Sequence, residues 1–252
     1  MFKTFKADLH IHTCLSPCGD LEMTPSAIVR EAKKRGLEII GICDHNSAEN
    51  ITATQNAGQR EGIAVIAGME VTSSEEVHIL ALFDDFAEAI QLQTIIYEHL
   101  VPGVNDEAVF GEQVVVNYKD EVLGFNPRLL IGATSLTVQK VIEAIHSLSG
   151  LAIASHIDRE AFGIIGQLGF VPADSGLDGL EVSPRISCQE ARAKFPDANN
   201  FSLVTFSDAH YLQDIGKTWT QFLIKEPTVK EMKMALIGEE GRKILTCAIE
   251  KQ

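Results

Sequence analysis

The feature that most constrains this chain is that its apolar, strand-like segments end, one after another, in side chains able to bind metal ions. These residues are His10, His12, Asp44, His45, Glu70, His156, Asp208 and His210, with His78 near the start of the fourth segment. Polar residues gathered at the carboxyl ends of many strands are typical of a barrel, where one end carries the chemistry. We therefore expect an irregular α/β barrel rather than an open doubly wound sheet.

The segments between these polar residues show the alternation of strands and helices that such a barrel needs. Thr24 and Pro25 form a good start for a helix over 25–35, Gly36 stops it, and apolar spacing predicts another helix over 138–148. Strands that alternate with helices imply parallel pairing. Strands are expected at 4–9, 37–43, 63–67, 77–83, 151–154, 179–182, 202–206 and 219–224.

Residues 84–134 break this alternation. The stretch has helical character near 87–100 and little strand signal, although 111–121 could form a hairpin or a lid. Long excursions within a compact domain are usually functional lids or insertions. We expect residues 1–252 to form one domain that carries an insertion or lid at about 84–134.

Composition narrows the class of protein. The 252 residues are 45 % hydrophobic, enough for a full core, and no apolar run approaches the roughly 20 residues that span a bilayer. The first six residues lack the order of a secretion signal, so we expect a cytoplasmic protein without membrane contact. Five cysteines without framework spacing suggest reduced thiols.

The net charge of the chain limits the binding partners that we expect. With 21 basic and 35 acidic residues, the net charge of −14 disfavours long nucleic acid, because Lys and Arg contacts to phosphate dominate such binding. A small phosphorylated substrate remains compatible with this charge, since bound divalent metal ions can invert its local sign.

The histidine pairs themselves indicate metal binding. Residues two apart on a strand share a face, so His10 and His12 can reach one ion, and Asp208 and His210 repeat the spacing. Imidazole suits zinc, manganese or iron, and Glu70 adds oxygen ligands. A lone histidine near a strand end is more often a satisfied polar residue, but that explanation does not extend to the whole set.

Six motifs, in order, resemble those of the PHP family, named for polymerase and histidinol phosphatase. They are "DLHIHTCLS", "CDHN", "GMEV", "HILALF", "SHID" and "FSDAH", and they extend from Ala7 to about Tyr211. The chain is most similar to the stand-alone branch described as metal-dependent phosphoesterases. The resemblance implies an irregular (β/α)7 barrel with its active site at the carboxyl ends of the strands and two or three divalent ions there, Zn, Mn or Fe.

The resemblance also implies a grouping of ligands. One ion would be held by His10, His12, Glu70 and Asp208, a second by Glu70, His78 and His210, and a third by His45 and His156. Where relatives usually have a His or Asp for the third ion, this chain has Cys18, with Asp20 two residues further on. A thiolate ligand from Cys18 would favour zinc, whereas a carboxylate ligand from Asp20 would keep the ligands of the site hard. Water could complete the site instead. Asp44 resembles a residue that orients a neighbouring ligand.

This centre predicts hydrolysis of a phosphomonoester, a nucleotide or a short oligonucleotide end by a metal-activated water. Asp208, His210 or His156 could protonate the leaving oxygen, and Arg159 and Arg185 could bind the substrate phosphate. Each arginine could equally cap a helix or pair with a nearby glutamate. Two other functions fit the same residues: a ligand-binding or regulatory module without turnover, and a metal-dependent C–N hydrolase. The substrate, the native metal and the oligomeric state are left open.

Overall fold

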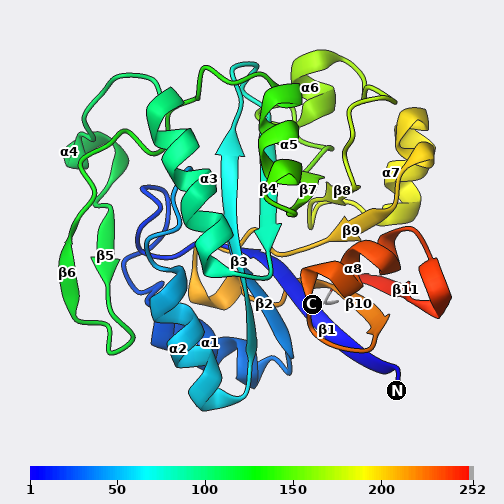
Figure 1. Ribbon diagram of the computed structural model, residues 1–252, viewed down its shortest axis with the longest axis horizontal. Coiled ribbons are helices and arrows are strands. Elements are labelled where there is room, and N and C mark those ends of the chain that lie inside the picture. Colours follow the sequence, from blue (N-terminus) through cyan, green and yellow to red (C-terminus); the bar gives the residue numbers. More distant parts are fainter. Residues whose placement is uncertain (250–252) are drawn as a thin grey trace.

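The computed structural model describes residues 1–249, and its centre is a strongly curved, mixed sheet (Figure 1). Within these residues the strand order is β11-β10-β1-β2-β3-β4-β7-β8-β9. The strands are β1 (Lys3–Ile11), β2 (Ile39–Ile42), β3 (Ala64–Thr72), β4 (His78–Phe83), β7 (Leu151–Ala154), β8 (Gly179–Val182), β9 (Leu203–Thr205), β10 (Thr218–Ile224) and β11 (Lys243–Ile249). Every strand that the sequence predicts is therefore present.

Helices connect most of these strands. They are α1 (Pro25–Lys34), α2 (Ile51–Glu61), α3 (Phe86–His99), α4 (Glu107–Phe110), α5 (Val138–Ser147), α6 (Ile164–Leu168), α7 (Cys188–Lys194) and α8 (Val229–Leu236), with 3₁₀ turns at Pro196–Asn200, Leu212–Asp214 and Glu239–Gly241. In α5 the apolar stripe expected from the sequence is buried, and the Thr137 hydroxyl caps the helix by accepting a hydrogen bond from the backbone N–H of Lys140.

The two ends of the sheet approach each other and nearly close a barrel. Just after β9, Ala209 donates its backbone N–H to the carbonyl oxygen of His10 (3.2 Å) and accepts from the N–H of His12 (3.0 Å). At the last residue of β9, Thr205 donates its N–H to the hydroxyl of Thr220 on β10 (2.9 Å). The predicted irregular barrel is confirmed, with the β10–β11 pair added beside β1.

The expectation of parallel pairing is wrong at β10, which runs antiparallel to β1, and at β4. This strand runs antiparallel to both of its neighbours, β3 and β7. The link from Thr72 to His78 is too short for a crossover, which needs a dozen or more residues, so the chain must turn straight back. As a result the start of β4 lies at the same end of the barrel as the carboxyl ends of the parallel strands. His78, the first residue of β4, pairs with Thr72, the last residue of β3.

The region 84–134 folds into α3, α4 and a hairpin of β5 (Val114–Val116) and β6 (Val122–Phe125). The hairpin lies at the left edge of Figure 1, apart from the main sheet. The amide of Asn50 fastens it, accepting from the N–H of Val116 (3.0 Å) and donating to the carbonyl of Val114 (3.0 Å). The role of this insertion as a lid, and the treatment of the chain as one domain, stay predictions.

Among the helices of residues 1–249, none combines the length and the apolar character that crossing a lipid bilayer requires.

The barrel wall leaves no room for a side chain at Gly41 in β2. A Cβ atom there would lie 2.4 Å from the carbonyl oxygen of Leu9 and 2.8 Å from its Cα, and backbone atoms of a central strand cannot move aside. We expect Gly41→Ala to lower the free energy of unfolding by about 3 kcal/mol. Gly124→Ala in β6 is the matched control, because nothing lies within 4 Å of its Cβ position. Denaturant unfolding of both variants measures the difference, and equal stability would contradict this packing argument.

Candidate metal centre

The carboxylate of Glu70, at the end of β3, is the centre of the polar cluster. Glu70 is 1 % exposed, and the histidines around it are buried as well. Its Oε1 lies 3.4 Å from His10 Nε2, 3.0 Å from His78 Nδ1 and 3.3 Å from His156 Nε2, and its Oε2 lies 3.5 Å from His12 Nε2 and 3.3 Å from His45 Nδ1. Imidazoles from five different points of the chain thus surround one carboxylate.

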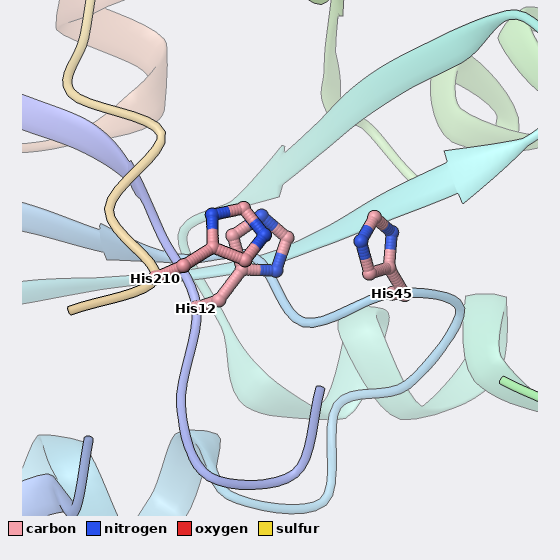
Figure 2. Close-up of side chains that lie close together, drawn as sticks. All are labelled: His12, His45 and His210. Atoms are coloured by element: carbon pink, nitrogen blue, oxygen red, sulfur yellow. The ribbon is translucent and has the colours of Figure 1, made fainter. Parts of the chain in front are cut away.

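Among residues 1–249, three sets of side chains place their ligand atoms within 4.8 Å of one another: His10, His12, Glu70 and Asp208; His45, Glu70 and His78; and His12, His45 and His210. The first set is the one that the family resemblance implies. The other two sets differ from the implied grouping. His45, rather than His210, lies with Glu70 and His78, and His210 lies with His12 and His45. The rings of His12 and His210 stack with 4.2 Å between their centroids. Figure 2 shows these two side chains together, with His45 beside them.

The donor atoms suit divalent ions. Among the described residues, the buried side-chain atoms without a hydrogen-bond partner include three in this cluster that face one another: His45 Nδ1, His78 Nδ1 and Glu70 Oε1. Buried polar atoms nearly always have a hydrogen-bond partner. Unpaired atoms that face one another therefore indicate a site for a ligand such as a metal ion. Imidazole nitrogen with carboxylate oxygen is a donor set for zinc, manganese or iron. The residues present therefore fit such ions.

Electrostatics keeps most of these side chains in the metal-binding form. Burial, and then the neighbouring His210, lowers the pKa of His12 to about 4, so its imidazole is neutral at pH 7. Burial also moves the pKa of His45 well below its ordinary value. Burial alone would raise the pKa of Glu70, but the imidazoles of His78 and His10 outweigh it and hold that pKa well below the usual range.

His10 is the exception. Burial alone would lower its pKa, yet the carboxylates of Glu181, Glu70 and Asp208 together raise it well above the ordinary value. This means that the surrounding negative charge attracts a cation to His10. A divalent ion can replace that proton and compensate the same carboxylates.

A second layer of side chains orients the ligands. His10 Nδ1 lies 2.9 Å from Glu181 Oε2, and His12 Nδ1 lies 2.9 Å from the hydroxyl of Ser16. That hydroxyl in turn donates to Asp44 (2.7 Å), which also accepts from the N–H of Thr13 (2.7 Å). Asp44 thus acts on His12 through Ser16, as a residue that orients a neighbouring ligand would.

The sequence analysis did not identify Glu181 as part of the site. A signal existed, because Glu181 lies within the apolar strand segment 179–182, and a buried glutamate requires a partner. The sequence could not tell which partner, since His10 is far away along the chain.

The other predicted residues lie at the rim. Arg159 Nη1 contacts Asp208 Oδ2 at 2.6 Å, whereas Arg185 is exposed after β8. Cys18 is exposed at the protein surface. The carboxylate of Asp20 accepts from the N–H of Glu22 (2.8 Å). Neither Cys18 nor Asp20 belongs to the three ligand sets found in the described residues.

Four of the eight non-glycine residues with positive φ in the described chain belong to loops that carry or adjoin the cluster. Asn46, His156, Phe162 and Asp208 have positive φ angles of 50°, 30°, 61° and 51°. Non-glycine residues rarely adopt this conformation, and such strain concentrates at functional sites. The backbone here is held in place to aim particular side chains.

Comparison with known proteins agrees with this geometry. The family model described as PHP domain matches residues 8–165. The uncharacterised protein YqxK of Bacillus subtilis is 26 % identical over 96 % of this chain and 64 % of its own length. The phosphoribosyl 1,2-cyclic phosphate 1,2-diphosphodiesterase of Eggerthella lenta is 32 % identical over 30 % of this chain and 29 % of its own length.

Among solved structures, the lesion-specific endonuclease Q of Pyrococcus furiosus superimposes with a TM-score of 0.68 at 18 % identity, over 96 % of this chain and 58 % of that protein. Endonuclease Q has also been solved with a 27-mer duplex substrate that has an abasic lesion at the active site. At this identity the likeness shows a shared fold. The chain spans less than two thirds of the length of each of these proteins.

The contact between Glu181 and His10 generates a testable prediction. We expect Glu181→Gln to weaken metal binding about 10- to 100-fold, because loss of the charged partner leaves His10 less basic and less firmly oriented. Calorimetric titration of chelator-treated protein with Mn²⁺ measures the affinity. Glu143→Gln on the exposed face of α5 is the control, since Glu143 pairs only with Lys140 among the ion pairs of the described chain. Unchanged affinity in Glu181→Gln would contradict an orienting role.

Proposed function

The chain belongs to the PHP domain family, and from this premise we propose that it is a hydrolase that cleaves phosphoesters with bound divalent metal ions. The observation that carries the proposal is the buried Glu70 carboxylate in contact with imidazoles from several strands. The unpaired nitrogens of His45 and His78 support it further. So many ionisable groups buried together without compensating cations would be very costly.

Bound ions would supply Lewis acidity and lower the pKa of a coordinated water. His10, His12, Glu70 and Asp208 would hold one ion, and His45, Glu70 and His78 another, with Glu70 shared between them. His12, His45 and His210 would form a third site. Zn, Mn and Fe are the metals that this donor set suits.

Three residues are proposed to protonate the leaving oxygen: Asp208, His210 and His156. The side chain of His210 is 23 % exposed, against 3 % for His156 and 4 % for Asp208, so its imidazole is the most accessible to a leaving group at the rim. Its Nδ1 lies 2.9 Å from the backbone carbonyl oxygen of Asp208, which orients the ring.

Arg159 is proposed to bind the substrate phosphate. Its Nη1 already reaches Asp208 in the ligand cluster, and its buried Nε has no hydrogen-bond partner among the described residues. A guanidinium held in this way has donors left for phosphoryl oxygens. Arg185, exposed on the segment after β8, is proposed as a second cationic contact.

A phosphomonoester, a nucleotide or a short oligonucleotide end is the proposed substrate. The preference for short substrates rests on the net charge of −14, which is a property of the whole chain and not of the cleft. Because endonuclease Q shares this fold and has been solved with duplex DNA, a duplex belongs in any substrate test.

The central experiment is chelation followed by addition of Mn²⁺, Zn²⁺ or Fe²⁺. We expect two to three ions per chain, and hydrolysis of p-nitrophenyl phosphate, bis(p-nitrophenyl) phosphate, 5′-nucleotides or an abasic duplex that follows metal content. Glu70→Gln should lose both metal and activity. Metal without turnover would favour a ligand-binding module, cleavage of a p-nitroanilide alone would favour C–N hydrolysis, and absence of metal would refute the proposal.

Arg159→Gln tests the phosphate contact. We expect KM for the best phosphoester to rise roughly 10- to 100-fold, because a hydrogen bond to a charged group is lost, while the number of bound ions stays the same. Arg159→Lys should recover part of the loss, since it keeps the charge without the paired donors. Arg30→Gln, on the exposed surface of α1, is the control. An unchanged KM in Arg159→Gln would remove this residue from the substrate site.

A further inference from the structure

The loop that follows β7 wraps around His78. The backbone N–H of His78 donates to the carbonyl of Phe162 (3.0 Å), and the carbonyl of His78 accepts from the N–H of Ser155 (3.0 Å). The ring of Phe162 also stacks on the imidazole of His78, with 4.5 Å between centroids and 19° between planes. Both polar backbone groups and one face of this histidine are therefore in contact with a single loop.

Phe162 occupies this position at a conformational cost. Its φ of 61° is in the left-handed region, and its side chain is 38 % exposed. A bulky residue in this region is a genuine outlier, and a half-exposed ring gains little from burial. Folding alone would favour glycine or asparagine here, so the ring itself requires an explanation.

The loop geometry holds the ring in place. A Cβ atom at Gly163 would lie 2.4 Å from the carbonyl oxygen of Arg159, and one at Gly166 would lie 2.2 Å from that of Glu160. These close backbone contacts hold the turn tightly wound on both sides of Phe162. The fold thus fixes the backbone that carries the ring, next to His78.

Within the described residues, His78 lacks the hydrogen-bonded support that His10 and His12 have. His10 and His12 have the Glu181 carboxylate and the Ser16 hydroxyl on their second nitrogens. In the described chain His78 has no hydrogen bond of this kind, and its Nδ1 faces Glu70 Oε1 at 3.0 Å without one. Stacking on one face can fix the plane of an imidazole where a hydrogen bond does not.

We infer that Phe162 is a positioning residue: its ring holds the imidazole of His78 toward Glu70 and shields from water the ion that His45, Glu70 and His78 would share. The inference rests on the metal site of the proposed function but not on phosphoester hydrolysis. It assigns a role to an aromatic residue that lies outside all three ligand sets.

The test compares metal binding in four variants. Phe162→Leu keeps apolar volume but removes the flat ring, Phe162→Tyr keeps the ring, Phe162→Gly relieves the positive φ while removing the ring, and Phe170→Leu changes a 53 % exposed phenylalanine elsewhere between β7 and β8. Each is titrated with Mn²⁺ by calorimetry after chelation. Loss of bound ions to excess chelator is then followed by elemental analysis.

We expect Phe162→Leu and Phe162→Gly to weaken one ion about tenfold and to release it faster, as loss of ligand orientation does, while Phe162→Tyr and Phe170→Leu behave as the unmodified protein. Phe162→Gly should unfold no more readily than the unmodified protein, because glycine accepts the left-handed backbone. Thus weaker metal binding in this variant cannot come from misfolding. Unchanged affinity and release in both Phe162→Leu and Phe162→Gly would overturn the inference. Metal binding that depends on Phe162 without any phosphoester turnover would support it and refute only the proposed function.

Discussion

The structure depends on the burial of one carboxylate. Glu70 is 1 % exposed and is surrounded by imidazoles, and a charge removed from water in this way must be compensated by cations or by donors. The compensation comes from histidines that reach it from β1, β4 and the loops after β2 and β7. The near-closure of the sheet, the reversal of β4 and the strained loops all have the effect of bringing those side chains to one point.

The reversal of β4 shows how a local constraint changes the site. A short link from β3 forces the next strand to run backwards, and this reversal places His78 beside Glu70 from the opposite direction. In an all-parallel barrel a residue at the start of a strand would lie at the far end from the chemistry. The irregularity of the barrel is therefore part of what builds the ligand cluster.

The residues with strained backbones around the cluster also depend on contacts with distant parts of the chain. Asn46, His156, Phe162 and Asp208 each adopt a positive φ in a segment that follows a strand. Such conformations persist only where the surrounding structure holds them. At Asn46 that support is visible, since its amide donates to the carbonyls of Leu130 and Gly132 and its oxygen accepts from the N–H of Thr72. The region 84–134 thereby stiffens the rim of the site, whatever further role it has.

The sequence by itself determined eight strands of the main sheet and the helices α1, α3 and α5, because apolar periodicity and the Thr24-Pro25 start are local signals. It did not determine β11 or the bounds of the β5–β6 hairpin. It also determined which residue types gather at the strand ends, since i, i+2 spacing places His10 and His12 on one face. Only the tertiary structure decided the direction of β4, the grouping of His45 with His78, and the partnership of Glu181 with His10. These depend on contacts between residues far apart in the chain, and no local pattern records which distant side chain a closing sheet will bring within 3 Å.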